Sequence, residues 1–351
     1  MSTMPPVAEM ERAYLAGDTA YRGLFFLGVR TTGIFCLPGC PARKPLPRNV
    51  EYFPSTTAAM TAGYRPCKRC EPLAQGQQPA WVTGLLADVE REPSARITDG
   101  ELRRRGIDPA TARRYFQRTY GMTFQAFARA RRLSGALHVI REGASIDDAV
   151  FESGYESHSG FRDAFARAFG ASPGKRPSRE EVFVTRLDSP LGPLVAGATD
   201  AGVCLLEFTD RRMLEKQLRT VGRLFGGPVV PRENRHLETL RAELTAYFAG
   251  KLQRPSVPLQ YPGTPFQKRV WDELLRIPYG QTRSYEEMAR LVGAPRAVRA
   301  VGTANGMNRI AILIPCHRVV NKDGRLGGYG GGLRRKERLL ALERTGKALS
   351  D

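Results

Sequence analysis

The sequence IFCLPGC at residues 34–40, together with CKRC at residues 67–70, decides the fold of the N-terminal part of this chain. Its cysteines Cys36, Cys40, Cys67 and Cys70 form two close pairs with 26 residues between them. Two such pairs can bring four sulfurs to one tetrahedral Zn²⁺ ion, so we predict a zinc site made of these four thiolates. A purely structural zinc site is the common outcome of this spacing. Redox dithiols are less favoured, because two separate pairs point to one shared metal.

The charge of the chain indicates the partner. Its 351 residues carry a formal net charge of +19, which favours a polyanion such as double-stranded DNA. The same charge could instead serve solubility or an anionic membrane surface. We find no apolar run as long as a spanning helix and no signal-peptide core at the N-terminus. We therefore expect no membrane association and a cytoplasmic, nucleoid-associated protein whose cysteines stay reduced.

Two polar seams, at residues 71–79 and 172–178, divide the chain into modules. A chain of this length exceeds a single hydrophobic core, so we expect several domains of a multidomain α+β protein. The boundaries that we predict are 1–78 for the zinc-binding domain, 79–178 for an all-α domain, and 179–262 and 263–351 for two C-terminal subdomains.

The all-α module contains an internal repeat at one constant offset. Its paired positions are Arg113 with Arg162, Phe116 with Phe165, Gly121 with Gly170, and Thr123 with Ser172. Each copy predicts a helix, a tight turn and a second helix with basic residues outside, which is typical of a helix-turn-helix unit. We expect Arg113, Arg114 and Arg162 to bind DNA. A plain helical bundle with solvated arginines is the alternative.

The C-terminal part changes from strand to helix periodicity. Residues 182–187, 191–198 and 203–208 predict strands, the first two joined in a hairpin. Helices are predicted beyond residue 262, among them one at 296–305 rich in Ala and Gly. Small residues there suit either close approach to a DNA groove or packing against another helix.

The string ILIPCHRVV at residues 312–320 places Cys316 beside His317. A cysteine with an adjacent histidine can form a nucleophile and base pair, as in cysteine hydrolases. A dipeptide alone is weak support, and a buried structural cysteine is the default interpretation.

Three longer stretches resemble known families. The residues SIDDAVFESGY (145–155) and the FGASP that ends at Pro173 resemble the DNA-binding domain of AraC-type regulators, which implies two helix-turn-helix units reading successive major grooves. The residues RTTGIFC (30–36) and GYRPCKRC (63–70) resemble the zinc domain of the Ada family of alkylation-response regulators. The 312–320 string resembles the active site of O6-alkylguanine-DNA alkyltransferases.

The zinc-domain resemblance implies that Cys36 is both a zinc ligand and a methyl acceptor from DNA methylphosphotriesters. Four thiolates around Zn²⁺ leave about two net negative charges. Methylation of Cys36 would remove one of them, so repulsion from DNA phosphates would fall and specific binding would tighten. Arg43 is a candidate phosphate contact.

The alkyltransferase resemblance implies a ribonuclease H-like β-subdomain followed by a winged-helix-like helical subdomain. It implies that Cys316 accepts the alkyl group, that His317 takes its proton through a water, and that Glu343 orients the imidazole. Three further roles are implied, for residues that serve as hinge, wedge and phosphate contact: Asn308, Arg299 and Tyr285. Gly330 departs from family members that place a serine near the substrate oxygen, so the range of alkyl groups and bases is open.

Together these features predict a single-turnover methyltransferase that repairs O6-methylguanine and O4-methylthymine at Cys316 and methylphosphotriesters at Cys36. Methylated Cys36 would switch the protein to a sequence-specific transcriptional activator that meets RNA polymerase at promoter sites, as a monomer. The alternative is a zinc-containing AraC-type transcription factor with an inactive alkyltransferase fold.

Overall fold

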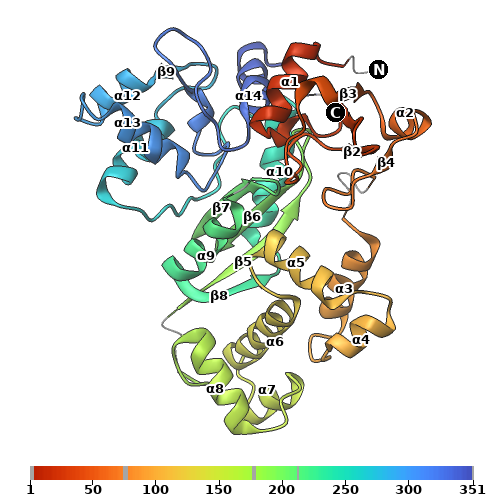
Figure 1. Cartoon of the computed structure of the whole chain (residues 1–351). Helices are drawn as coiled ribbons and strands as arrows, with labels where there is room; N and C mark the ends of the chain where they lie inside the picture. The colour runs from red at the N-terminus through yellow and green to blue at the C-terminus, as the bar shows by residue number, and fades with distance from the viewer. Residues whose placement is uncertain (1–3, 74–77, 176–178, 212, 350–351) are drawn as a thin grey trace.

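The computed structural model describes residues 4–73, 78–175, 179–211 and 213–349 (Figure 1). The two predicted seams lie partly outside this described range. Within it, two four-stranded sheets and the helices around them form three regions along the chain, which confirms the multidomain α+β class. No helix in these described segments is long and apolar enough to cross a membrane.

The N-terminal region is a small sheet covered by short helices. Its strands run in the order β3-β1-β2-β4, where β2 pairs antiparallel with β1 and parallel with β4. Its elements are α1 (Val7–Ala16), η1 (Thr19–Tyr21), β1 (Phe26–Val29), β2 (Ile34–Cys36), η2 (Pro47–Asn49), β3 (Val50–Phe53), α2 (Thr56–Thr61) and β4 (Arg65–Pro66). Phe35 lies opposite Pro66 in the parallel pair. Both cysteine pairs therefore begin at the same end of the sheet, where the neighbouring strands β2 and β4 finish.

The middle region is entirely helical among its described residues. Its helices are α3 (Ala80–Arg91), α4 (Asp99–Arg104), α5 (Pro109–Tyr120), α6 (Phe124–Arg141), α7 (Ile146–Glu152) and α8 (His158–Phe169). The helix pairs α4–α5 and α7–α8 are the two predicted copies. Both α5 and α8 span 12 residues and end at a glycine in the left-handed region, Gly121 and Gly170. A capping box of Ser145 with Asp148 starts α7.

Phenylalanine spacing builds the core of the second copy. Phe161, Phe165 and Phe169 of α8 lie four residues apart and are all fully buried, so they share one face of the helix. They pack with Ala149 and Val150 of α7 in one cluster. Arg162 stays exposed on the other side of α8, as the amphipathic pattern predicts.

The C-terminal region joins a sheet to a group of helices. The predicted hairpin and third strand are confirmed, and the sheet order is β7-β6-β5-β8. Its first elements are β5 (Glu180–Leu187), β6 (Leu194–Thr199), β7 (Gly202–Phe208), α9 (Leu214–Phe225), β8 (Gly226–Pro231) and α10 (Arg235–Phe248). Strand β8 was not predicted from the sequence; it pairs parallel with β5 after a helical crossover through α9.

The helical part begins at α11, whose Thr264 cap and Pro265 start it with a capping box. Its elements are α11 (Pro265–Leu275), β9 (Arg283–Ser284), α12 (Tyr285–Leu291), α13 (Val298–Gly306), η3 (Cys316–Arg318), β10 (Val319–Val320) and α14 (Leu333–Thr345). Helix α13 buries Val301 and Ala304 and contacts α11 and α12, and its opposite face is exposed. Small residues therefore serve its packing and leave one face open.

The regions pack against one another (Figure 1). One hydrophobic cluster unites α5 and α6 with the β5–β7 sheet and α9, through residues such as Phe116, Tyr120 and Leu218. At the other end, η1 contacts α14, and the guanidinium of Arg334 lies 5.5 Å from the Tyr21 ring centroid. The helix-turn-helix region and the zinc-domain fold thus both lie against the C-terminal region.

Candidate functional site

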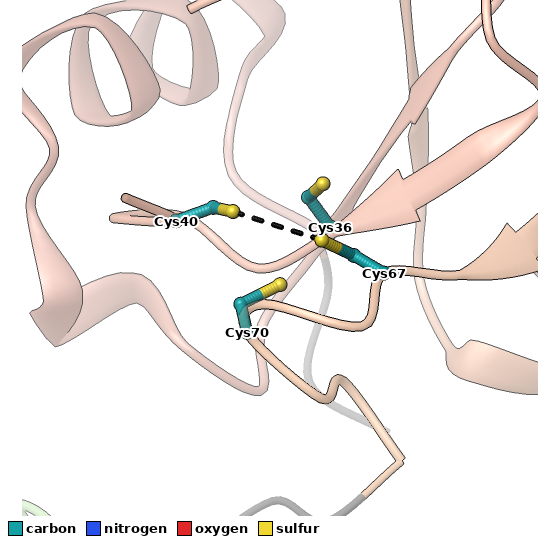
Figure 2. Close-up of side chains that lie close together, drawn as sticks. All are labelled: Cys36, Cys40, Cys67 and Cys70. Carbon is teal, nitrogen blue, oxygen red and sulfur yellow. Dashed lines mark hydrogen bonds between the residues drawn. The ribbon is translucent and has the colours of Figure 1, made fainter. Parts of the chain in front are cut away.

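The four N-terminal cysteines converge on one point (Figure 2). Their sulfurs all lie within 4.8 Å of one another, and Sγ of Cys40 is 4.0 Å from Sγ of Cys67. A tetrahedral zinc ion with Zn–S bonds of about 2.3 Å would place its sulfurs about 3.8 Å apart. The donor set and its spacing therefore fit Zn²⁺, and the predicted metal ligands Cys36, Cys40, Cys67 and Cys70 are brought together.

The thiols of this cluster also influence one another's ionisation. The hydrogen bond from Cys36 lowers the pKa of Cys40 to about 2, and the same bond raises the pKa of Cys36. Neighbouring thiols thus compete for ionisation, because each new thiolate repels the next. A divalent cation removes this competition and lets all four ionise.

Only some of the four sulfurs accept a hydrogen bond from a backbone N–H group in the described segments. Leu37 N lies 3.4 Å from Sγ of Cys70, and Arg69 N lies 3.4 Å from Sγ of Cys67. Within the described segments, no backbone N–H donates to Sγ of Cys36. A hydrogen bond to a thiolate stabilises its negative charge and so weakens it as a nucleophile. Cys36 at the end of β2 lacks that stabilisation.

A cavity of about 330 Å³ opens beside three of these cysteines. Five basic residues line it together with Cys36, Cys40 and Cys67: Arg43, Lys44, Arg65, Lys68 and Arg69. The predicted phosphate contact Arg43 is therefore at this cavity. The other four were not predicted as a group, although Arg65, Lys68 and Arg69 lie within the 63–70 motif.

Two asparagines hold Cys316. Nδ2 of Asn308 donates to Sγ of Cys316 at 3.2 Å and to the carbonyl of Ile314 at 2.9 Å. Nδ2 of Asn305 donates to the carbonyl of Cys316 at 3.3 Å. Cys316 is buried, and Ile312 just before it has a φ of 71°, a conformation that is strained for a β-branched residue. The reactive segment is therefore held by its surroundings in one shape.

His317 and Glu343 meet as predicted by the resemblance. Nε2 of His317 lies 2.8 Å from Oε1 of Glu343, and both side chains are fully buried. Nδ1 of His317 has no hydrogen-bond partner among the described residues. Nδ1 is therefore the ring nitrogen that remains available, because Nε2 is hydrogen-bonded to Glu343.

Glu343 has partners that the sequence analysis missed. The hydroxyl of Tyr247, in α10, donates to Oε1 of Glu343 at 2.6 Å. Arg318 donates to both carboxylate oxygens, from Nε at 2.8 Å and from Nη2 at 2.9 Å. Arg318 lies within the 312–320 motif, whereas no local signal marks Tyr247, which is 96 residues away from Glu343.

The environment sets the protonation states of this group. Burial raises the pKa of the Cys316 thiol, partly offset by the Asn308 hydrogen bond. Burial lowers the pKa of His317 against the opposing effect of Glu343. Burial alone would raise the pKa of Glu343, but the hydrogen bonds and charges of His317 and Arg318 outweigh it and hold that pKa well below its usual range. The resting arrangement is a neutral thiol, a neutral imidazole and a carboxylate.

The predicted wedge and phosphate contact lie on neighbouring helices. Arg299 is exposed in the first turn of α13. Tyr285 begins α12, and its half-buried ring lies between Gly302 and Gly327, since a methyl group added at Gly327 would approach the ring to 2.7 Å. Burial raises the pKa of the Tyr285 hydroxyl, and a hydrogen bond with Asn305 opposes this rise.

The predicted DNA-binding arginines lie on corresponding helices of the repeat. Arg113 and Arg114 in α5 are 54% and 72% exposed, and their nearest carboxylates are Asp99 at 3.9 Å and Asp108 at 4.0 Å. Arg162 is exposed at the equivalent place in α8. Such weak, exposed pairs leave the guanidinium groups free to exchange a carboxylate for a phosphate.

Comparison with family models matches three segments of the chain. The metal binding domain of Ada matches residues 9–72, a helix-turn-helix domain matches 102–176, and the 6-O-methylguanine DNA methyltransferase DNA binding domain matches 265–345. Fold and sites together define a DNA-repair methyltransferase with a zinc-binding domain and an AraC-type helix-turn-helix region.

Whole-length relatives narrow this class. The chain is 32% identical over 343 residues to the bifunctional transcriptional activator/DNA repair enzyme Ada of Escherichia coli, covering 95% of each chain. The chain belongs to the Ada family. It is also 47% identical over 163 residues to a methylated-DNA–protein-cysteine methyltransferase of Mycobacterium leprae, which covers 46% of this chain and 93% of that one. Among solved structures, Mycobacterium tuberculosis OGT in complex with DNA is 42% identical, covers 48% of this chain and 95% of that chain, and has a TM-score of 0.41.

Proposed function

We propose that this chain repairs alkylated double-stranded DNA by irreversible methyl transfer to two of its own cysteines, Cys316 for bases and Cys36 for the backbone. The single observation that carries the proposal is the buried group in which Asn308 donates to Sγ of Cys316 while the adjacent His317 is hydrogen-bonded to Glu343. A cysteine kept only for packing needs no such set of polar partners, since each buried polar group costs free energy unless it is paired.

The reaction at Cys316 is a single nucleophilic displacement at the methyl carbon. The Sγ proton passes to Nδ1 of His317 through a water, and Glu343 stabilises the resulting imidazolium. The sulfur then attacks the methyl carbon of O6-methylguanine or O4-methylthymine. A C–S bond forms, the C–O bond breaks, and its electron pair leaves with the base, which takes up a proton. The thioether that remains cannot leave in water, so each chain reacts once.

For this reaction the base must leave the duplex, since Cys316 is buried. Arg299 would fill the gap left in the base stack, and Tyr285 would press on the phosphate that rotates. Their positions on α13 and α12, beside the Asn308 segment, support these roles. Gly330 leaves the choice between guanine and thymine adducts open.

The Cys36 reaction needs no base in the protein. Zn²⁺, held by Cys36, Cys40, Cys67 and Cys70, would supply a thiolate at neutral pH. Sγ of Cys36 attacks the methyl carbon of a methylphosphotriester, and the C–O electron pair returns to the phosphate as a phosphodiester anion. The basic cavity lined by Arg43 would hold the backbone, and the lack of a backbone N–H donor favours Cys36 over Cys67 and Cys70.

We further propose that methylated Cys36 converts the protein into a sequence-specific transcriptional activator. The helix-turn-helix region would bind promoter DNA through Arg113, Arg114 and Arg162. RNA polymerase as a partner, a monomeric state and a nucleoid location follow from the family likeness and complete the proposal. We also propose that the domain boundaries lie at residues 78, 178 and 262.

The test is the stoichiometry of methylation. Protein mixed with DNA that carries both lesions should gain one methyl group at Cys36 and one at Cys316, measured by intact mass and peptide mapping. Repeated turnover would indicate a cysteine hydrolase. A chain methylated at Cys36 alone would indicate a zinc-containing transcription factor with an inactive C-terminal fold.

A further inference from the structure

Arg211, just after β7, has an unusual position for an arginine. Its side chain is only 8% exposed, and it pairs with Glu207, which is fully buried. Glu207 also accepts a hydrogen bond from the backbone N–H of Phe208 at 3.0 Å. An ion pair so deep in the protein costs desolvation, so it points to a task other than solubility.

The guanidinium group holds the segment that carries Asn308. Its Nη2 donates to the carbonyl of Gly306 at 2.6 Å, and its Nη1 donates to the carbonyl of Asn308 at 3.2 Å. Nε2 of Gln217 adds a second donor to the Asn308 carbonyl at 3.3 Å. The side chain of Asn308 in turn donates to Sγ of Cys316. One residue thus separates the guanidinium of Arg211 from the acceptor sulfur.

The same guanidinium closes against the loop on the far side of the site. A Cβ added at Gly330 would lie 2.5 Å from Cζ of Arg211 and 2.8 Å from both Nε and Nη2. Real Cβ atoms do not approach other atoms so closely, and the guanidinium is held by three hydrogen bonds that oppose its displacement. Gly330 therefore lacks a side chain because Arg211 occupies the space that a side chain would need.

From these contacts we infer that Arg211, anchored by Glu207, is a positioning residue for Cys316. It fixes the Asn308 segment on one side and the Gly330 loop on the other, and so sets the width of the site around the sulfur. Arg211 and Gly330 form a matched pair, in which a side chain at position 330 requires the loss of the guanidinium. The inference rests on the proposed function, since it assumes that Cys316 accepts the alkyl group.

The first experiment replaces the ion pair without leaving a buried charge. The double variant Glu207→Leu/Arg211→Met removes both charges and keeps similar volumes, a replacement that buried pairs often tolerate. Single-turnover methylation of Cys316 by O6-methylguanine DNA should slow about 10- to 100-fold at saturating DNA, as for other residues that orient reactive groups. The half-saturating DNA concentration should stay unchanged, because Arg211 acts on the sulfur segment. Cys36 methylation on the same molecules reports that the N-terminal region is intact, and denaturant unfolding reports that the C-terminal region is folded.

The second experiment tests the matched pair. Gly330→Ser in the native background should slow Cys316 methylation, whereas the same substitution in the Glu207→Leu/Arg211→Met background should cost little, because no hydrogen bonds hold the methionine side chain and it can turn away from position 330. Gly328→Ser is the matched control: a Cβ there meets nothing within 4 Å, so its rate should equal that of the native protein. The coupling between the two changes is the quantity measured.

The outcomes separate this inference from the function on which it rests. If native protein is not methylated at Cys316, the proposed function fails. If native protein is methylated but the Glu207→Leu/Arg211→Met variant reacts at the native rate, the positioning role is wrong. Additive effects of Gly330→Ser and the pair replacement would overturn the matched pair.

Discussion

Oε1 of Glu343 lies 2.8 Å from Nε2 of His317, in a site where both side chains are inaccessible to solvent. The carboxylate stands on α14 and the imidazole on η3, so their meeting depends on how the last helix packs. Glu343 also balances the buried charge of Arg318. This one carboxylate therefore serves both the proposed reaction and the stability of the C-terminal region.

Replacing Glu343 by Gln should slow Cys316 methylation about 10²- to 10⁴-fold, since the imidazole loses the charge that stabilises its protonated form. The free energy of unfolding should fall by about 3 kcal/mol, because Arg318 loses its buried partner. Single-turnover kinetics and denaturant unfolding measure the two effects. Cys36 methylation is the internal control, and a native Cys316 rate would contradict the role of Glu343.

The pH dependence follows from His317, whose pKa is lowered in the folded state by burial. A base with a lowered pKa stays neutral, and able to accept a proton, below its ordinary value of 6.5. Cys316 methylation should therefore keep most of its rate at pH 6.5 and fall only at lower pH. A rate that already halves at pH 6.5 would show that His317 is not so shifted.

The same shift affects stability. Between the lowered folded pKa and the unfolded value of 6.5, the unfolded chain binds more protons than the folded one. The stability that His317 contributes is therefore present above pH 6.5 and is lost as the pH falls below it. His317→Gln should flatten the unfolding free energy in this window, measured by denaturant titration at several pH values. An unchanged pH slope would contradict the shift.

Metal removal should separate the two acceptors. A chelator that extracts zinc should abolish Cys36 methylation and leave the Cys316 rate unchanged, because the two sulfurs ionise by different means. Purified protein should contain about one zinc per chain, and Cys67→Ser should lower that content. Cys204→Ala is the control: Cys204 is buried in the hydrophobic core, where burial raises its pKa to about 12, so zinc content should not change.

Substitutions of the exposed arginines in α5 and α8 should weaken operator binding. Arg162→Ala should weaken binding and reduce the slope of log affinity against log salt by about 1 if the side chain contacts a phosphate. Arg113→Ala should act similarly in the first copy. Arg91→Ala, in the exposed last turn of α3, serves as the control with the same charge change. Equal effects at Arg91 and Arg162 would indicate only a general charge effect.

Methylation of Cys36 should tighten operator binding. Loss of one negative charge about 4 Å from a phosphate is worth about 1 kcal/mol in water, roughly fivefold in affinity. The gain should shrink at high salt because such charges are screened. Fluorescence anisotropy on methylated and unmethylated protein measures it, and equal affinity at low salt would remove the charge argument.

Local signals made much of the fold predictable. The capping box of Ser145 and the glycine ends of α5 and α8 act within four residues, so the spacing of residue types reveals them. The spacing within each cysteine pair is also a local signal, and the parallel pairing of β2 with β4 then brings the two pairs together. Strand β8 was missed because its partner β5 lies across a helical crossover.

By itself the sequence determined which residues carry the proposed chemistry, the zinc-binding cysteines and the Cys316–His317 motif, and that a helix-turn-helix region lies between them. Tertiary structure alone decided what surrounds them. Tyr247 reaches Glu343, and Arg211 reaches the Asn308 carbonyl, across 96 and 97 positions of sequence. A hydrogen bond within a helix turn depends on neighbouring residues, whereas these bonds depend on the packing of whole elements. Gly330 shows the difference, since only the folded chain brings the Arg211 guanidinium to the place that a Cβ at this position would occupy.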